Sequence, residues 1–149
     1  MNNNIETVIR EATKQDAEQL CSLFKQHALY EGHDLVLSDQ ALALLHLPDC
    51  PLTIFVVEEA NEIKGYMSLI KQFSTWDMNY YLYMDCLYLL PALRGKGLGK
   101  KLMLVCQQYG KKHKLAEIQW QTPIENVDAI EFYRCIGAKH KSKLRYFWG

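Results

Sequence analysis

The segment RGKGLGKK, residues 94–101, constrains the fold more strongly than any other part of this sequence. It separates a tyrosine- and leucine-rich stretch that ends at Pro91 from a long helical pattern. Helices rarely begin with so many glycines, because each glycine gives up backbone entropy when it is fixed. Backbone N–H groups at a helix start lack partners and carry partial positive charge, and glycines let an anion come close to them. The segment therefore predicts a strand, an anion-binding loop and a helix, in that order.

Two common phosphate-binding patterns do not fit this loop. The P-loop pattern GxxxxGK(S/T) is absent, because Lys100 stands where its second glycine would be. The dinucleotide pattern GxGxxG also fails, because Gly95, Gly97 and Gly99 simply alternate. Taken alone, the loop is equally compatible with a glycine-rich turn whose lysines are solvated.

Composition narrows the class of protein. The 149 residues are about half apolar, which suits one compact domain spanning 1–149. Lysine plus arginine equals aspartate plus glutamate, 17 each, so nucleic acid is not an expected partner. The sequence has no secretory signal pattern and no apolar run of about 20 residues, so we expect no membrane partner. The five scattered cysteines are typical of a cytoplasmic protein with reduced thiols.

Hydrophobic periodicity predicts an α/β fold. Helices that return between strands imply a mixed sheet that is covered by helices on both faces. The expected strands cover residues 7–12, 52–59, 63–73, 80–90, 116–122 and 143–148. The expected helices cover residues 14–30, 39–46, 98–113 and 126–136. Residues 60–62 are expected to form the turn of a hairpin.

Local signals mark several helix ends. Thr13 and Asp16 are spaced as in a capping box, with aspartate in place of glutamate. Ser38 can cap the short second helix. Asn126 stands at the start of the last helix, and Gly137 is its expected C-terminal stop.

Three segments, in order along the chain, carry a family resemblance. VIREATKQDAEQL, residues 8–20, would form a first strand and helix, and Arg94-x-x-Gly97-x-Gly99 fits the signature (Q/R)xxGx(G/A). Residues 126–138 contain Asn-x-x-Ala-x-x-Phe-Tyr followed by Gly-Ala. Together they resemble the GNAT superfamily of N-acetyltransferases over nearly the whole chain. The resemblance implies a mostly antiparallel central sheet of about six to seven strands, with helices on both faces.

Within that superfamily, HALYE at 27–31 and the stretch 73–99 look closest to one branch. This branch contains the spermidine/spermine and thialysine N-acetyltransferases. Its members have Tyr-Glu near the end of the first helix and a Glu-Asp pair in the strand before the loop. Here Asp85 and Cys86 stand in place of that pair, so one carboxylate is missing. A polyamine is a cationic chain and would be bound better by several carboxylates.

The resemblance implies that acetyl-CoA is the co-substrate. Its pantetheine would pair with the backbone of Leu87 and Leu89, Asn126 would contact the cofactor, and Tyr133 would reach the sulfur. The residues implied at the pyrophosphate are Arg94, Gly95, Lys96, Gly97, Leu98, Gly99 and Lys100.

Two residues are candidates for the chemistry. A lysine-like amine must lose a proton before it attacks, which costs about 4.6 kcal/mol at pH 7. Asp85 stands in an otherwise apolar and aromatic strand where a charge is costly, so we expect it to be the general base. A structural aspartate is the alternative. Tyr133 is implied as the general acid for the leaving thiolate, and a core tyrosine is its alternative. Cys86 is expected on the opposite side of the strand from Asp85, as a packing residue.

The residues expected to bind the acceptor are Tyr30, Glu31, Trp76, Asp85 and Trp120. Acids would attract a cationic acceptor, as Asp34 and Asp77 also could, and aromatic rings would pack against it. For each aromatic residue, core packing is the alternative. His33 lies near two acids but lacks firm ligand spacing, so no metal is expected. The other histidines, His27, His46, His113 and His140, have no recognisable partner and are expected to be surface or structural residues.

The leading hypothesis is an acetyl-CoA-dependent N-acetyltransferase acting by direct attack on a primary amine of a small molecule: a polyamine, a diamine or an amino-acid-like compound. A protein or peptide N-acetyltransferase and a non-catalytic acyl-CoA-binding sensor are the alternatives. By analogy with the branch, a homodimer is expected, with the aromatic residues RYFW at 145–148 in the interface.

Overall fold

The computed structural model describes residues 5–38, 40, 43, 45, 47–115 and 117–149. Within these residues, five strands form one sheet in the order β1-β2-β3-β4-β5. The strands are β1 (Thr7–Glu11), β2 (Leu52–Glu59), β3 (Glu62–Ser74), β4 (Asn79–Leu89) and β5 (Ile118–Gln119). The helices are α1 (Ala17–Tyr30), α3 (Leu98–Lys112) and α4 (Val127–Cys135), with short 3₁₀ turns η1 (Lys14–Asp16) and η2 (Pro91–Leu93). The pairings β1–β2, β2–β3 and β3–β4 are antiparallel, and the pairing β4–β5 is parallel.

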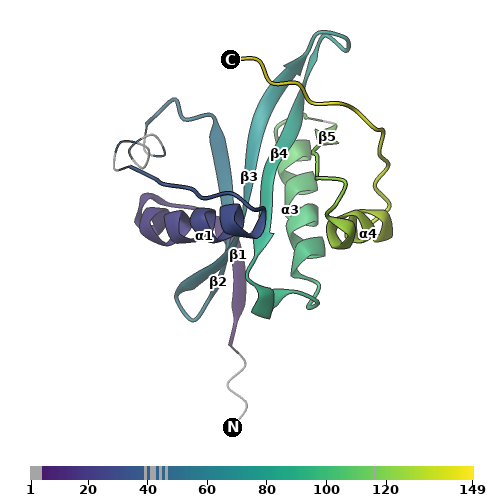
Figure 1. The fold of residues 1–149 in the computed structure, drawn as a ribbon. Helices are drawn as coiled ribbons and strands as arrows, with labels where there is room; N and C mark the ends of the chain where they lie inside the picture. The colour runs from purple at the N-terminus through teal and green to yellow at the C-terminus, as the bar shows by residue number, and fades with distance from the viewer. Residues whose placement is uncertain (1–4, 39, 41–42, 44, 46, 116) are drawn as a thin grey trace.

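Helices cover both faces of this sheet (Figure 1). On one face, α1 packs its buried leucines, Leu20 and Leu23, against Val56 and Tyr66. On the other face, buried Leu102 of α3 packs in a cluster with Val57 and Met67. Neighbouring residues of one strand thus belong to different layers, as the pleat requires. The expected fold class is confirmed, although the described sheet has five strands where six to seven were expected.

The hairpin of β2 and β3 turns where the sequence predicts it. Ala60 has φ 52° and Asn61 has φ 64°, so both central residues are left-handed. Positive φ at both positions gives a turn whose twist matches that of the flanking strands. Asparagine adopts the left-handed region readily, so the presence of Asn61 makes residues 60–62 recognisable as a turn in the sequence.

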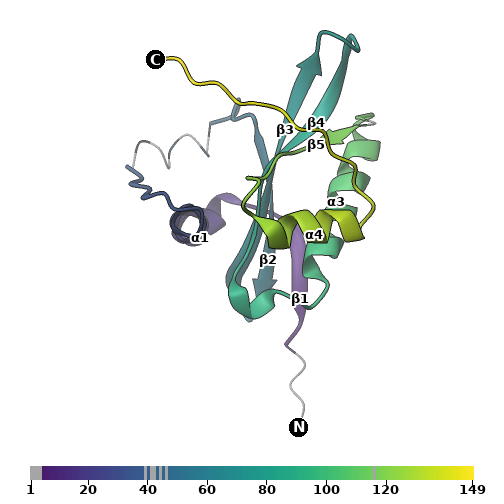
Figure 2. The ribbon, with the colours of Figure 1, turned by 45° about the vertical axis from the view of Figure 1, so that its right-hand side comes forward.

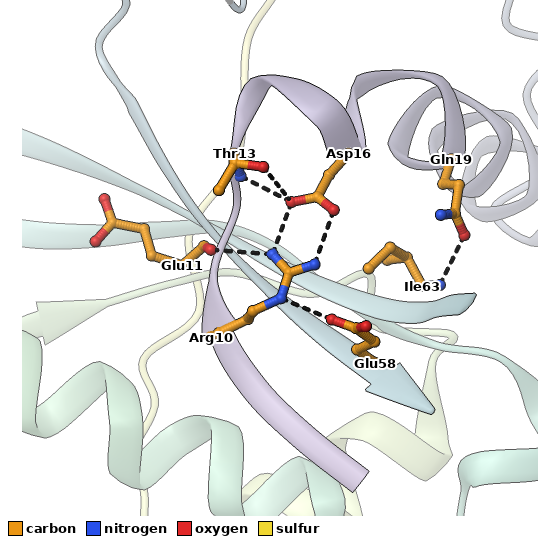
Figure 3. Close-up of polar contacts among 7 residues, drawn as sticks. All are labelled: Arg10, Glu11, Thr13, Asp16, Gln19, Glu58 and Ile63. Atoms are coloured by element: carbon orange, nitrogen blue, oxygen red, sulfur yellow. Dashed lines mark hydrogen bonds and ion pairs between the residues drawn. The ribbon is translucent and has the colours of Figure 1, made fainter. Parts of the chain in front are cut away.

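A partly buried ion pair, with Asp16 buried and Arg10 half-buried, connects β1 to the start of α1 (Figure 3). The guanidinium of Arg10 donates to both carboxylate oxygens of Asp16, at 2.8 and 2.9 Å, and to Glu58 at 2.7 Å. Asp16 also accepts the backbone N–H of Thr13 at 2.7 Å, as the capping-box spacing predicts. Hydrogen bonds from Arg10, and then from the Thr13 backbone, hold the pKa of Asp16 down at about 2 against the effect of burial.

We expect Asp16→Asn to lower the free energy of unfolding at pH 7 by about 2 kcal/mol, because each unit of pKa shift is worth about 1.4 kcal/mol. The carboxylate stabilises the fold above its unfolded pKa of about 4, and this contribution is lost as the pH falls toward 2. Urea unfolding of both proteins between pH 7 and pH 2 measures the difference. A difference that does not shrink with acidification would contradict the assignment.

Two predicted elements differ in the structure. Of the strand expected over 116–122, the described residues 117–122 form only the two residues of β5, and residue 116 lies outside the described part of the chain. Residues 143–148 form no strand, and Leu144, Tyr146, Phe147 and Trp148 are each at least 80% exposed. This C-terminal tail, residues 143–149, crosses the molecule near β4 and β5 without joining the sheet (Figure 2). Residues 143–148 could form a strand only by pairing with the edge of a sheet. The last strand, β5, has only two residues and offers a very short edge.

Other expectations concern the helices. The helix expected over 39–46 lies largely outside the described residues. His46 is not among the described residues. The remaining helices begin and end close to the predicted residues. The side chain of Asn126 accepts the N–H of Ala129 at 3.3 Å, and Gly137 follows the last turn with φ 85°. No helix among the described residues is both long enough and apolar enough to cross a lipid bilayer.

Candidate active site

The glycine loop delivers the N-terminus of α3 to the end of β4. Gly95 has φ 73° and Gly97 has φ 76°, which is the left-handed region that glycine enters at little cost. Gly97 is the N-cap of α3, and no side chain caps that end. The first intrahelical hydrogen bond at this end is donated by Lys101 to the Gly97 carbonyl, at 3.1 Å. The backbone N–H groups of residues 98–100 therefore have no intrahelical partner and can bind an external acceptor.

Gly99 has a different role in the same loop. A Cβ atom at this position would lie 3.1 Å from the ring of Phe132. The glycine therefore lets the first turn of α3 approach α4 closely. The neighbouring residue on α4 is Tyr133, so this packing sets the distance between the loop and the tyrosine.

The strands β4 and β5 are paired over only a short stretch, and we call the space beside the unpaired part of β4, residues 84–89, the opening. Their pairing consists of Leu82 with Ile118 and Tyr83 with Gln119. Past Tyr83, no described strand pairs with this edge of β4, and Leu87 and Leu89 lie on that stretch. An extended amide-containing chain such as pantetheine can hydrogen-bond to a free strand edge in the same way as a further strand.

A β-bulge places Asp85 at this opening. The register of β3 and β4 passes from Leu69 opposite Met84 to Ser68 opposite Cys86, so Asp85 is the extra residue. Met84 packs in the layer under α3, whereas Cys86 packs in the layer under α1.

This bulge corrects the expected orientation of Cys86. Its Sγ lies 3.8 Å from a carboxylate oxygen of Asp85, on the same face of β4, because a bulge breaks the alternation of side chains. Burial, and then the charge of Asp85, raise the pKa of the Cys86 thiol. The thiol therefore stays protonated at neutral pH, which fits the packing role that we expected.

The C-terminal end of α1 faces the same opening. Tyr30 packs against the guanidinium of Arg94, whose Cζ lies 4.7 Å from the ring centroid. Arg94 also donates from Nε to the Leu89 carbonyl at 2.9 Å. Arg94 thus connects the glycine loop to α1 and to the edge of β4.

His27 is one of the histidines expected to be surface or structural, and it has several partners that the sequence alone does not reveal. Its Nδ1 lies 2.5 Å from the hydroxyl of Tyr66, and its ring stacks on Tyr88 with centroids 4.8 Å apart. Its Nε2 lies 3.5 Å from a carboxylate oxygen of Glu31. Burial lowers the pKa of His27, and the nearby Glu31 carboxylate opposes this in part.

Tyr133 reaches the opening from the other side, on α4. Its ring packs between Trp120, at 5.1 Å between centroids, and Phe132, at 5.3 Å. Burial, and then the negative charge of Glu31, raise the pKa of Tyr133 to about 12. The phenol is therefore a protonated donor at neutral pH, and Glu31 of α1 lies close enough to influence it.

Several of the predicted residues are in contact with one another. Tyr30 packs on Arg94 of the glycine loop, and Trp120 packs on Tyr133. The charges of Glu31 and Asp85 both act on His27, whereas Lys96 lies near Glu59 at the end of β2. Asn126 caps α4 through Oδ1, so a contact with a cofactor would use its amide nitrogen.

Trp76 is not part of this group. It sits in the connection between β3 and β4 and is almost fully exposed. Asp85 lies six positions along β4 from Asn79 at the start of the strand, which corresponds to about 20 Å. Asp77 lies in the same connection and accepts the hydroxyl of Ser74.

Sequence reasoning missed His27, Tyr66 and Tyr88. Each is common as a packing residue, and only the tertiary contact between α1 and the sheet makes them a polar cluster. A weak signal was available, since both tyrosines have side-chain hydroxyls that need a partner when buried.

Comparisons with known proteins agree with this geometry. Residues 11–138 match the model of the acetyltransferase (GNAT) family. An uncharacterized N-acetyltransferase, YhfO of Bacillus subtilis, is 26% identical over 126 residues, with 84% of this chain and 85% of that protein covered. Thialysine N-epsilon-acetyltransferase of Mus musculus is 26% identical over 149 residues, with 89% and 84% covered.

A solved structure shows the same fold. The aminoglycoside N-acetyltransferase AAC(6′)-Iy in complex with CoA superposes with a TM-score of 0.80 at 19% identity, over 100% of this chain and 98% of that one. The family match spans the loop, the open edge of β4 and Tyr133 together. The chain therefore belongs to the acetyltransferase (GNAT) family and is an acetyl-CoA-dependent N-acetyltransferase.

Proposed function

We propose that this enzyme acetylates the primary amine of a small molecule, such as a polyamine, a diamine or an amino-acid-like compound. The observation that carries the proposal is the opening beside β4. Carboxylates of Asp85 and Glu31 approach it from one side, and the protonated phenol of Tyr133 approaches it from the other. The names of the mouse relative and of AAC(6′)-Iy point to small amine-bearing acceptors, which supports this choice over a peptide.

Acetyl-CoA would lie across the loop and along β4. The backbone N–H groups of residues 95–100 would bind the pyrophosphate, with charge from Arg94, Lys96 and Lys100. Pantetheine would pair with the edge of β4 at Leu87 and Leu89, where the Leu89 carbonyl already accepts from Arg94. This arrangement would point the thioester at the gap between Asp85 and Tyr133.

Acetyl transfer would then proceed by direct attack. Asp85 takes a proton from the acceptor ammonium, and the neutral amine attacks the thioester carbonyl. Backbone N–H groups near Leu87 stabilise the developing oxyanion. The C–S bond breaks as the C–N bond is completed, and the thiolate takes its proton from Tyr133. The second proton that the nitrogen loses on becoming an amide then passes through water to the Tyr133 phenolate and restores the phenol. The exposed position of Asp85 lets it pass the proton on to water.

A screen for thiol release from acetyl-CoA tests the proposed acceptor class. We expect release of coenzyme A with at least one member of a panel of polyamines, diamines, amino acids and aminoglycosides. A parallel incubation with peptide libraries, read by mass spectrometry, covers the alternative. Turnover of peptides with no turnover of any small amine would overturn the proposal.

The substitution Asp85→Asn tests the general-base role independently of the other roles in the site. We expect kcat/KM for the acceptor to fall about 100-fold at pH 7, because the amide cannot take the ammonium proton. The loss should shrink as the pH approaches the pKa of the acceptor. Asp77→Asn, the same substitution in the β3–β4 connection, is the matched control. A pH–rate profile of Asp85→Asn that superposes on that of the wild type would rule out the role.

We also propose a homodimer. The tail carries four large, exposed apolar side chains, Leu144, Tyr146, Phe147 and Trp148. A soluble monomer seldom exposes such a group together, and aromatic residues are enriched at interfaces. Light scattering of the intact chain and of a chain shortened by residues 143–149 should give a dimer and a monomer, respectively. A monomeric intact chain would contradict the proposal.

A further inference from the structure

His27 forms part of a polar cluster between α1 and the sheet. Tyr66, which is 3% exposed, contacts Nδ1 of His27 at 2.5 Å, and Tyr88, which is 7% exposed, stacks on the ring with an interplanar angle of 17°. These contacts fix both the position and the plane of the imidazole. Nε2 then points toward Glu31, at 3.5 Å from Oε1.

The hydrogen-bond partners select one tautomer of the ring. Burial raises the pKa of Tyr66, so its hydroxyl keeps its proton and needs an acceptor. The Cys86 sulfur is a second partner of this hydroxyl, so the tautomer is selected by the Glu31 carboxylate beside Nε2: the ring proton lies on Nε2, and Nδ1 accepts from Tyr66. In this tautomer the N–H faces a carboxylate, whereas the other tautomer would turn a lone pair toward the same negative charge.

We propose that His27 is a positioning residue of the acceptor site, which holds the Glu31 carboxylate beside Tyr133 so that it anchors the cationic acceptor. The inference rests on the proposed function, because it assigns Glu31 to acceptor binding. Glu31 follows the last residue of α1 and is the C-cap of that helix. A glutamate at a helix end has several rotamers, and the Nε2–H of His27 restricts them.

The charge state of His27 also controls what Glu31 can bind. Neutral His27 leaves the full negative charge of Glu31 available, whereas protonated His27 forms an ion pair with Glu31 and competes with the acceptor. The groups facing the imidazole are Glu31 at the C-cap of α1, Tyr66 from β3, Asp85, Cys86 and Tyr88 from β4, and Arg94 from the glycine loop. Arg94 disfavours protonation, while Asp85 and Glu31 favour it, and burial outweighs them. Acceptor binding should therefore weaken only below the ordinary pKa of histidine, about 6.5.

Two substitutions distinguish positioning from packing. His27→Leu fills the same space without hydrogen bonds, and we expect it to raise KM for the acceptor about 10-fold at pH 7.5. KM for acetyl-CoA and kcat should stay close to the wild-type values. His27→Gln can accept from Tyr66 and donate to Glu31, so it should restore KM at pH 7.5. It cannot be protonated, so it should lack the rise in acceptor KM at acidic pH that the wild type shows.

The result that overturns the inference differs from the one that overturns the proposed function. If amines are acetylated and His27→Leu has the wild-type KM for them, His27 has no positioning role. If no small amine supports thiol release, the proposed function itself fails. The contact is also measurable without turnover, by NMR titration of the imidazole. Glu31→Gln should lower the pKa of His27, and an unchanged titration would show that Glu31 is not held by this ring.

Discussion

Tyr133→Phe is expected to lower kcat for acetyl transfer by between tens and about a thousandfold while coenzyme A still binds. The ring of phenylalanine keeps the packing with Trp120 and Phe132, so the site retains its shape. The substitution removes only the hydroxyl, whose pKa of about 12 keeps it protonated throughout the neutral range. Without it, the thiolate must leave unprotonated or take its proton from water.

Steady-state kinetics and coenzyme A binding, measured on the same preparation, separate the two effects. Tyr109→Phe is the matched control, because it also removes a phenolic oxygen from the layer under α3, where the hydroxyl lies 3.1 Å from that of Thr53. We expect this control to keep its kcat. A Tyr133→Phe enzyme with wild-type kcat would show that Tyr133 is only a packing residue.

Gly97→Val is expected to weaken coenzyme A binding by about 10- to 100-fold, since an L-residue in the left-handed region costs about 1–2 kcal/mol and a β-branched one costs more. The present φ of 76° leaves room for a Cβ, so the effect comes from the backbone and not from a clash. The free loop would relax to negative φ and turn its N–H groups away from the pyrophosphate. Binding would then have to restore the strained conformation.

Gly137→Val is the matched control for this loop. Gly137 has φ 85° at the end of α4 and also has space for a Cβ, so the strain is similar in kind. It should lower stability, seen in urea unfolding, with little change in the affinity for coenzyme A. Equal affinities of Gly97→Val and wild type would show that the loop conformation does not bind the cofactor.

The sequence predicts those parts of the site that depend on local chemistry. The φ values of Gly95 and Gly97 follow from the loop pattern, and the caps of α4 follow from Asn126 and Gly137. The hairpin at Asn61 is local in the same sense. Each of these features is set by the conformational preference of one residue and its immediate neighbours.

Other parts depend on contacts between distant segments, and the sequence does not reveal them. The bulge at Asp85 arises from the register between β3 and β4, so alternation along β4 alone assigns Cys86 to the wrong face. The partners of His27 come from β3 and β4, and no spacing in the chain links them. The tail at 143–148 has the pattern of a strand, but a strand forms only where an edge is available.

Titration calorimetry of the intact chain with coenzyme A tests most directly whether the amides at the start of α3 bind the diphosphate. Measured at two temperatures, so that a zero enthalpy at one of them is not mistaken for absence of binding, the titration should show saturable heat with both coenzyme A and acetyl-CoA. Affinity in the range of ordinary enzyme substrates, about 1 μM to 1 mM, is expected. Pantetheine, which lacks the diphosphate, should bind far more weakly. Equal binding of pantetheine, or no heat with coenzyme A and acetyl-CoA at either temperature, would contradict the assignment.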